Sequence, residues 1–553
     1  MSRKKRILFI SESHKLASGF GTYANEVIPR LYKTGKYELA ELACYGQPES
    51  FKDTDWLTYG VAPMSKGEEQ YAKSYSNPQV QWGIIRFNYA VLDFKPDIVA
   101  AYRDPWMDQH IAESSLLPFF HWVWMPTVDS APQKEEWIYN LFNRCDGLLA
   151  YSEYGIRELD KQTNGKVKPV GCASPGIDPS TFNIIPNKKE HKKKFGLPED
   201  SFIVGTVMRN QKRKMFPELM KSFKQFLNQA PKEIAEKSYL YLHTSYPEKM
   251  GWDFSSIMHE FGLGSKLLTT YVCKVCKKYS VCQFSDAIAH CEHCGNMSGV
   301  LPGVSNGIDH KDLVNVYNLM DLYVQYAICE GFGMPQVEAA ACGTPIASID
   351  YSAMEDVVKY TGGYPIKPNL AREIETNADR SGPNNKNLVD IMLSCASQNA
   401  DKKNMQRLKT RKGCIDRYTW DIAAKSWEDY FDSVELGNKL PWNHPPRMNM
   451  IPKFEDIPKD MNNLNFLEWM YSKFVQDEYH LYNYEMMNFF RDMSFGATIS
   501  DKSLGKADQK SIYEKLKSRA EMRVAYDHIR CGLIQPSSES IKFIEEAHRR
   551  MKR

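Results

Sequence analysis

The sequence lacks any long apolar run, and no stretch approaches the roughly 18 consecutive apolar residues of a membrane-spanning helix. The basic start, Met1–Arg6, precedes an apolar run that is too short for a signal peptide and that suits a first strand better. An excess of charge of one sign is missing as well, since the formal net charge is only +3 and identifies no partner. We therefore expect a cytoplasmic protein whose contact with a membrane, if any, is peripheral.

Cysteine is not scarce, but its distribution does not favour disulfides. Of the 13 cysteines, five fall between residues 273 and 294 and the others are scattered. Without a signal peptide, this distribution indicates a reducing compartment with free or metal-bound thiols. The length of 553 residues predicts two or three domains, and 42% hydrophobic with 25% charged residues is typical of a soluble globular protein.

The most informative stretch is 329–345, which contains Glu330 and Glu338 with seven residues between them. Apolar runs at 321–327 and 344–349 predict buried strands on either side, and Glu338 falls in the opening of a helix. This order places the glycine-containing loop at the carboxyl edge of a parallel sheet, where α/β folds bind ligands. Helix N–H groups favour an anion there, and two carboxylates accept hydrogen bonds from sugar hydroxyls. The pattern indicates recognition of a nucleotide sugar.

This stretch is similar to the E-x7-E motif of retaining glycosyltransferases with the GT-B fold, the family 4 group. The residues that carry the resemblance are Glu330, Gly331, Phe332, Gly333, Met334 and Glu338. It covers roughly residues 5–435 and implies two Rossmann-like α/β domains that face a cleft. It also implies that Glu330 lies at the donor sugar and that Glu338 binds the ribose hydroxyls. The alternative is an ordinary helix start with a polar first turn.

The resemblance implies an N-terminal Rossmann-like acceptor domain at 1–182 and a nucleotide-sugar domain at 183–435. Residues 436–553 fall outside the resemblance, and helical periodicity at 466–474 predicts a mainly helical extension there. The lysine-rich run at 183–200 is typical of a solvated linker or helix face. Residues 501–553 contain 13 Lys and Arg against 8 Asp and Glu, a basic end that either contacts phosphates or forms a solvated helix.

Two features of the first region resemble the family less specifically. Gly19 and Gly21 lie where a helix is predicted to open after the first strand, and in isolation they indicate only a tight turn. In context they resemble the glycine-rich loop that faces the donor diphosphate and the acceptor. Asp129 stands near the point where many family members have a histidine at the donor sugar, so we expect a sugar or acceptor contact there. His121, inside a predicted strand, is more often a core residue.

Two cations follow the first strand predicted for the second half. Arg209 closes this strand, and Lys214 follows five residues later. Arginine offers a fork and lysine a point charge, so the two can converge on a diphosphate. Their spacing resembles the pair that stabilises the leaving diphosphate in the family, and therefore no catalytic divalent metal is expected. Lys212 or Arg213 could point inward instead.

Two C-x2-C knuckles with 14 residues between them lie at Cys273, Cys276, Cys291 and Cys294. Four thiolates at this spacing are typical of a closed, tetrahedral, structural zinc site. We therefore expect a zinc-ribbon insertion at 268–304. Competing ligands are Cys282, His290 and His293.

The predicted reaction moves a sugar, with retention of configuration, from a nucleoside diphosphate donor to an acceptor hydroxyl, and uridine diphosphate is the first choice of nucleotide. The E-x7-E variant, the Asp129 loop and the zinc ribbon resemble transferases encoded by large bacteriophages. This resemblance implies 5-hydroxymethylcytosine in double-stranded DNA as a candidate acceptor, and the host cytoplasm as the location. Two alternatives stay open: a glycan, lipid or protein acceptor, and a non-catalytic nucleic-acid-binding protein on a transferase scaffold.

Overall fold

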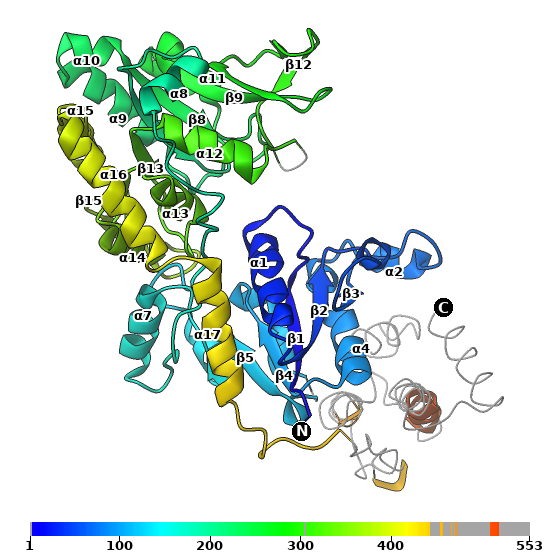
Figure 1. The fold of residues 1–553 in the computed structure, drawn as a ribbon. Coiled ribbons are helices and arrows are strands. Elements are labelled where there is room, and N and C mark those ends of the chain that lie inside the picture. The colour runs from blue at the N-terminus through cyan, green and yellow to red at the C-terminus, as the bar shows by residue number, and fades with distance from the viewer. Residues whose placement is uncertain are drawn as a thin grey trace, which may run out of the picture. The chain divides into compact units, whose positions relative to one another are not determined.

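The computed structural model describes residues 3–114, 116–303, 306–442, 454–456, 466, 469–470, 473 and 509–518 (Figure 1). The chain divides into two compact units. Unit 1 consists of Met1–Met125, Asn143–Gly147 and the described part of Phe431–Arg553, and unit 2 of Pro126–Phe142 and Leu148–Tyr430. The domain boundaries at residues 182 and 435 stay a prediction from the sequence.

The centre of unit 1 is a six-stranded sheet with the order β3-β2-β1-β4-β5-β6. Its strands are β1 (Arg6–Glu12), β2 (Glu38–Cys44), β3 (Leu57–Gly60), β4 (Ile98–Ala101), β5 (His121–Trp124) and β6 (Gly147–Leu148). The pairs from β3 to β5 are all parallel. This is the order of a doubly wound Rossmann fold, in which the direction of winding reverses between β1 and β4.

Short helices connect these strands: α1 (Gly19–Lys33), α2 (Glu69–Ser74), α3 (Pro78–Gln81), α4 (Ile84–Phe94), α5 (Gln109–Ala112), and the 3₁₀ turns η1 (Pro48–Phe51), η2 (Pro105–Met107) and η3 (Leu117–Phe119). Helix α1 begins where the sequence predicts a helix, because the Ser18 hydroxyl accepts a hydrogen bond from Gly21 N (3.1 Å). Its apolar face, which includes Tyr23, Val27 and Leu31, is buried.

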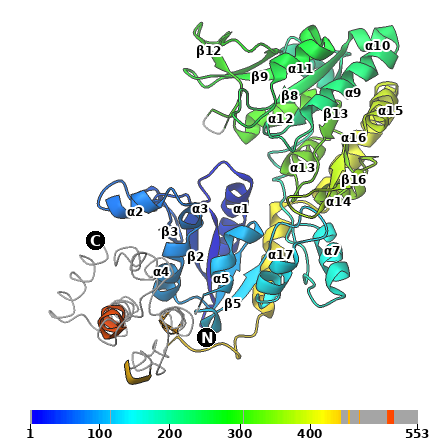
Figure 2. The ribbon, with the colours of Figure 1, turned by 180° about the vertical axis from the view of Figure 1, so that it is seen from behind.

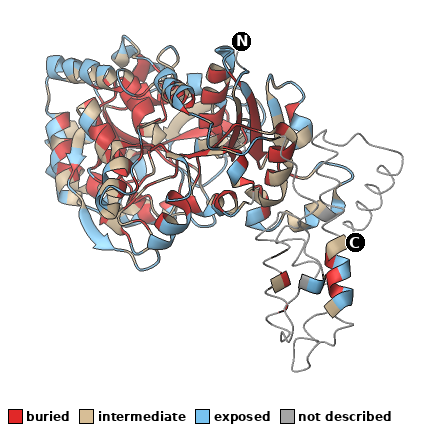
Figure 3. Ribbon diagram, turned by 90° about the horizontal axis from the view of Figure 1, so that it is seen from below, coloured by how far each residue is buried: buried red, intermediate tan, exposed pale blue. Residues whose placement is uncertain are grey.

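Unit 2 repeats the same strand order with other strands. These are β7 (Phe202–Val207), β8 (Ser238–His243), β9 (Leu267–Cys273), β13 (Leu322–Gln325), β14 (Ile346–Ile349) and β15 (Tyr364–Ile366). They pair in parallel in the order β9-β8-β7-β13-β14-β15, so the winding reverses between β7 and β13. The buried residues, red in Figure 3, include every residue of β7, β13 and β14.

Two further groups of strands belong to unit 2. The sheet continues past β9 with antiparallel strands, which are β10 (Tyr279–Gln283), β11 (Ala289–His290) and β12 (Met297–Val300). A separate antiparallel hairpin consists of β16 (Asn369–Arg372) and β17 (Asp379–Gly382).

The helices of unit 2 are α6 (Glu135–Trp137), the π-helical η4 (Ile138–Phe142), α7 (Glu153–Thr163), α8 (Lys188–Lys194), α9 (Phe216–Gln229), α10 (Lys232–Glu236), α11 (Phe254–Phe261), η5 (Gly264–Lys266), α12 (His310–Leu319), α13 (Met334–Ala341), α14 (Ala353–Thr361), α15 (Asn385–Ala396), α16 (Ala400–Ile415) and α17 (Trp420–Ser433), the last of which runs into unit 1. Helices α12 and α13 form a core with the sheet through Tyr317, Val337 and Tyr323. Helices α9 and α15 contact each other and are seen best from behind (Figure 2).

The lysine-rich run is not simply a solvated linker or helix face, because Lys192 is buried and Lys188 half-buried at the start of β13. Lys192 Nζ lies 2.6 Å and Lys188 Nζ 3.1 Å from the carboxylate of Asp321, which also accepts a hydrogen bond from Ile203 N (2.9 Å). Burial raises the pKa of Asp321, but the two ammonium groups outweigh it and bring that pKa below its ordinary value. The run therefore anchors α8 to the sheet.

The predicted helical extension is described only in part. Residues 509–518 are helical and bury Ile512, Tyr513 and Leu516, and the Tyr513 ring contacts that of Phe454 in η7 (Phe454–Asp456) at 5.5 Å. The rest of 443–553, including most of the basic end, lies outside the described residues. Among the residues that are described, no helix has the length and apolarity needed to cross a bilayer.

Replacement of Asp321 by asparagine should destabilise unit 2, because it leaves the ammonium groups of buried Lys192 and half-buried Lys188 without a counter-charge. We expect a loss of about 3–5 kcal/mol in the free energy of unfolding at neutral pH. The loss should begin to shrink below about pH 4, where the carboxylate becomes protonated in the unfolded state, and should vanish only at a still lower pH, where the folded-state carboxylate is protonated as well. Glu199→Gln, which breaks the exposed pair with Lys193, is the control and should leave the free energy of unfolding nearly unchanged in the same denaturant titration.

Candidate functional site

The loops after β7 and β13 are joined backbone to backbone. Because the winding of the sheet reverses between these two strands, their carboxyl ends open side by side. Met215 N donates to Tyr326 O (2.9 Å), and Ile328 N donates to Arg213 O (3.1 Å). Lys214 lies between these two hydrogen bonds and is fixed opposite the loop that carries Glu330.

Glu330 is buried and is held by three side chains. Lys214 Nζ contacts one carboxylate oxygen, Oε1, which also accepts a hydrogen bond from Gln325 Nε2 (2.6 Å). Arg213 donates to the other oxygen, Oε2, at 2.7 Å. The Glu330 side chain is 6% exposed, so this carboxylate is preorganised rather than solvated.

Lys214 is as buried as its partner. Burial, followed by the neighbouring Arg213, lowers the pKa of Lys214 well below its ordinary value. The contact with Glu330 acts in the opposite direction and favours the charged amine. An additional anion at this place would strengthen the ammonium form further.

The second glutamate, Glu338, lies in α13 and is also buried. The Tyr317 hydroxyl of α12 donates to Glu338 Oε2 at 2.5 Å and uses one of the two carboxylate oxygens. Burial raises the pKa of Glu338, and the Tyr317 hydroxyl partly offsets this rise. Glu330 thus lies in the loop before α13 and Glu338 within that helix, in different surroundings.

The structure explains why glycine occupies positions 331 and 333, between the two acids. Gly333 has φ +83° at the N-terminus of α13, a left-handed conformation that favours glycine. A Cβ on Gly331 would lie 2.3 Å from Thr127 Cγ2, so only glycine lets the 126–131 segment approach. Phe332 is buried against Tyr418, at a ring distance of 5.5 Å, and Met334 is the first residue of α13.

Asp129 lies beside the residue that precedes Glu330. The Cys329 thiol donates to Asp129 Oδ2 (3.3 Å), and Arg380 of β17 lies 3.1 Å from Asp129 Oδ1. Burial raises the pKa of Cys329 to about 12, so the thiol is protonated at neutral pH. Asp129 therefore lies next to the loop that carries Glu330. A contact of Asp129 with a sugar stays a prediction from the sequence.

Arg209 is placed differently from Lys214. Its side chain is 56% exposed and pairs with Glu248, with Nε 3.2 Å from Oε1. Inward contacts with Glu330 come from Arg213 and Lys214 instead. The role of Arg209 in diphosphate binding stays a prediction.

Sequence reasoning missed three residues of this site: Gln325, Ser352 and Arg380. Ser352 Oγ accepts a hydrogen bond from Glu330 N (3.1 Å). Gln325 had a signal, since it is a polar residue inside an apolar strand, but Ser352 and Arg380 lie in segments without a motif.

Unit 1 has a cavity at the carboxyl edge of its own sheet. Its volume is about 530 Å³, and the loops after β1, β2 and β3 line it. Lining residues include Ser13, Lys15, Tyr45, Gln47, Ser50 and Tyr75. Gly21 supports this wall, because its Cβ would lie 2.4 Å from Leu16 O, whereas Gly19 is unobstructed. Tyr45 has φ +64°, an unusual conformation for a bulky residue and a mark of functional sites.

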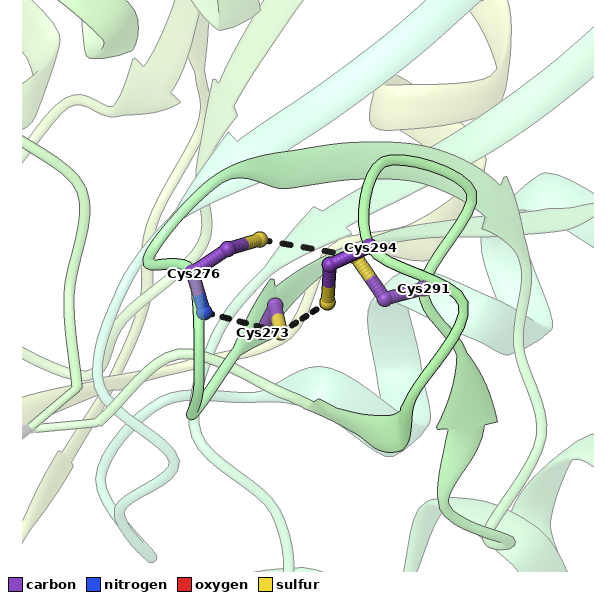
Figure 4. A group of neighbouring side chains, drawn as sticks. All are labelled: Cys273, Cys276, Cys291 and Cys294. Carbon is purple, nitrogen blue, oxygen red and sulfur yellow. Dashed lines mark hydrogen bonds between the residues drawn. The ribbon is translucent and has the colours of Figure 1, made fainter.

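The four cysteines of the knuckles converge on one point (Figure 4). Their Sγ atoms all lie within 4.8 Å of one another, and the pairs Cys273–Cys294 and Cys276–Cys291 are 3.6 Å apart. An ideal tetrahedral site with a Zn–S distance of about 2.3 Å requires sulfurs about 3.8 Å apart. The Ser298 hydroxyl, together with backbone N–H groups, lowers the pKa of Cys273 to about 5, which favours the thiolate that zinc binds. The donor set fits zinc.

The alternative ligands lie elsewhere in the ribbon. Cys282 is in β10 opposite Thr269, and His293 Nε2 lies 3.3 Å from Tyr279 O. Strand β9 pairs in parallel with β8 at Leu267 to Thr269. Its last residues, Val272 and Cys273, pair in antiparallel orientation with β12. The segment 268–304 thus shares β9 with the Rossmann-like sheet.

Comparison with known proteins agrees with this architecture. The fold is similar to that of sucrose-phosphate synthase from Thermosynechococcus elongatus, with 13% identity, a TM-score of 0.55, and 78% of this chain and 98% of that chain covered. A glycosyltransferase from Rickettsia africae matches with 15% identity, a TM-score of 0.52 and coverage of 78% and 98%. HepE from Anabaena, solved with UDP and glucose, matches with 12% identity, a TM-score of 0.52 and coverage of 78% and 100%. The expected GT-B fold, two doubly wound Rossmann-like halves, is confirmed.

The sequence itself matches a family model over a short part of the chain. Residues 303–381 match the family described as glycosyl transferases group 1, a segment that contains both Glu330 and Glu338. No curated protein matches the chain. The family match and the fold together support a glycosyltransferase.

The close approach at Gly331 can be tested with a second-site variant. Gly331→Ala should destabilise unit 2 by about 1–3 kcal/mol, because the new methyl group collides with Thr127 Cγ2. Thr127→Ser removes that methyl group, and the next nearest atom is then 3.7 Å away. Thermal melting of the single and double variants should show that Thr127→Ser restores most of the loss. Gly171→Ala, where a Cβ meets nothing within 4 Å, is the control, and additive losses would contradict the placement.

Proposed function

We propose that the protein is a retaining glycosyltransferase that moves a sugar from a UDP-sugar donor to an acceptor hydroxyl. The observation that carries this proposal is the buried contact of Glu330 with Lys214 at the point where the winding of the sheet reverses, in open α/β sheets the usual place of a ligand. Uridine is the first choice of base because HepE from Anabaena was solved with UDP and with UDP-glucose.

Each part of the donor then has a partner in unit 2. Glu338 receives the ribose hydroxyls on a carboxylate that Tyr317 orients. Glu330 orients hydroxyls of the donor sugar, and Asp129 faces the same sugar from the adjacent loop. Lys214, the N–H groups that open α13 at Met334, and Arg209, which exchanges Glu248 for phosphate, hold the diphosphate.

The reaction needs charge stabilisation more than it needs a base. The bond between the anomeric carbon and the diphosphate oxygen breaks, and the acceptor oxygen forms a new bond to that carbon on the same face. The departing diphosphate takes the acceptor proton. Lys214 and Arg209 stabilise the negative charge that develops on the leaving group, and preorganised charges of this kind usually accelerate a reaction more than any other single effect.

The cavity of unit 1 is the proposed place of the acceptor. Tyr45 and Tyr75 supply aromatic faces, Lys15 supplies a cation, and its volume of about 530 Å³ is that of a small-molecule site. Aromatic faces and a cation suit a flipped base with its phosphate, so 5-hydroxymethylcytosine in double-stranded DNA is the candidate we carry forward. Glycan, lipid and protein acceptors are the alternative arms of the test.

The four cysteines form, in this proposal, a structural zinc site, because four thiolates leave no open coordination position for catalysis. The ribbon braces the helix that carries Tyr317: Asn315 of α12 donates to the Tyr279 hydroxyl (3.1 Å), and Asn306 donates to Val272 O (3.3 Å). Zinc therefore supports the ribose side of the donor site from outside.

Donor binding and turnover should respond separately to two substitutions. Glu338→Ala should weaken UDP binding about 10- to 100-fold, the value of hydrogen bonds to a charged group. Lys214→Ala should lower kcat about 10²- to 10³-fold, since it removes stabilisation of the leaving group. Calorimetry with UDP and mass spectrometry of the products from a panel of nucleotide sugars measure the two effects. Glu236→Ala, an exposed residue of α10, is the control.

The same mass spectrometry identifies the acceptor. Hydroxymethylated DNA, unmodified DNA and a set of glycans are offered with each donor, and a mass increase of one hexose or pentose on the first alone supports DNA. Transfer of sugar to a glycan alone would show that the acceptor is a glycan and not DNA. Binding of duplex DNA, with no transfer to any acceptor and no binding of UDP, would instead indicate a non-catalytic nucleic-acid-binding protein.

Zinc content can be tested within the ribbon. The double variant Cys273→Ser and Cys276→Ser should lose the one equivalent of zinc that the wild type is expected to contain, with a lower melting temperature, because only two thiolates remain. Cys282→Ser is the matched control, a thiol of the same ribbon outside the cluster, and should keep its zinc. Full zinc content in the double variant, by elemental analysis, would refute the site.

A further inference from the structure

The hairpin of β16 and β17 is docked on the two loops that carry the acids of the donor site. Asp379 N donates to Ala131 O (2.8 Å), and two residues on, Ser381 N donates to Ile328 O (2.9 Å). Strand β17 is thus hydrogen-bonded to the Asp129 segment through Asp379 and to the Glu330 loop through Ser381. The Tyr351 hydroxyl reinforces the first contact, since it donates to Asp379 O (2.6 Å) and accepts from Ala131 N (3.2 Å).

Between these two backbone contacts lies Arg380, whose side chain is only 15% exposed. Its NH1 group lies 3.1 Å from Asp129 Oδ1 and donates to Cys329 Sγ at 2.8 Å. Its Nε donates to Glu373 Oε2 (3.0 Å) in the connection between the two strands. One guanidinium therefore joins the Asp129 segment, the residue before Glu330 and the hairpin itself.

The contacts around Arg380 form a closed circuit of donors and acceptors. The Cys329 thiol, which Arg380 contacts, donates to the other oxygen of Asp129 (3.3 Å), and Ser130 Oγ donates to Oδ1 (2.9 Å). A planar guanidinium with several fixed donors can satisfy such a geometry, whereas an ammonium group cannot reproduce it. Without the guanidinium, the side chains of Asp129 and Cys329 would keep, among the described residues, only their mutual contact and that of Ser130, while Arg213 would still donate to Cys329 O (3.2 Å).

We propose that Arg380 is a positioning residue for the sugar subsite: its guanidinium holds Asp129 as an acceptor and fixes the Cys329–Glu330 peptide, so that both acids face one sugar. This inference rests on the proposed function and adds to it a cation, 50 residues downstream of Glu330, that does not itself bind the nucleotide. Its effect is therefore confined to the sugar and to the transfer step.

The test compares UDP with UDP-glucose, because the two ligands differ only in the sugar. In Arg380→Ala, the affinity for UDP should stay within about twofold of the wild type. The affinity for UDP-glucose, and the rate at which UDP-glucose is cleaved to liberate UDP, should each fall about 10- to 100-fold. A loss of this size is usual when reacting groups are slightly misplaced relative to each other. Free guanidinium ion should restore part of the rate, a readout that general destabilisation would not show.

Two further variants keep the test decisive. Arg372→Ala is the matched control, since this arginine belongs to the same hairpin and pairs with Asp379 on its exposed side (2.7 Å), and it should leave both affinities unchanged. Arg380→Lys retains the charge and should fold even if the alanine variant does not, with unchanged UDP affinity and a rate below that of the wild type.

The outcomes separate this inference from the function on which it rests. A wild type that binds neither UDP nor UDP-glucose contradicts the proposed function. A wild type that binds both, with Arg380→Ala and Arg380→Lys unchanged for UDP-glucose, overturns the role of Arg380 alone. Equal losses for UDP and UDP-glucose would also overturn it, because they would show damage to the whole donor site.

Discussion

The proposed donor site depends on one constraint, the reversal of winding between β7 and β13. It forces the loops after these strands to open side by side, and two backbone hydrogen bonds, Met215 to Tyr326 and Ile328 to Arg213, then fix their register. This register places Lys214 opposite the loop of Glu330, so the backbone hydrogen bonds bring the two side chains into contact. The buried ion pair is costly to desolvate on its own, so the backbone contacts are what make the arrangement stable.

Elements around this site act as supports that hold its acids from different sides. The four-cysteine segment shares β9 with the sheet and contacts α12, whose Tyr317 donates a hydrogen bond to Glu338. On the other side, the β16–β17 hairpin holds Asp129 and the start of the Glu330 loop. Because each support reaches a different acid, damage to the ribbon and to the hairpin should be separable in their effects on nucleotide and on sugar.

Much of this arrangement could be predicted from the sequence where the signal is local. The apolar runs that flank Glu330 predict β13 and β14, and the spacing of the four cysteines predicts their convergence. The rest depends on tertiary packing that no spacing encodes. In the sequence, Lys188 and Lys192 are typical of solvated charges, and only the packing of α8 against the sheet pairs them with Asp321. Arg380 belongs to no motif, because the β16–β17 hairpin brings it into contact with Asp129, which lies 251 positions away in the chain.

A crystal structure of the protein with UDP is the most direct measurement of the central claim, that the β7 and β13 loops form a nucleotide site. We predict that the diphosphate lies beside Lys214 and the N-terminus of α13, with the ribose hydroxyls on Glu338. A nucleotide bound elsewhere, or a Glu338 carboxylate without contact to the ribose, would contradict it.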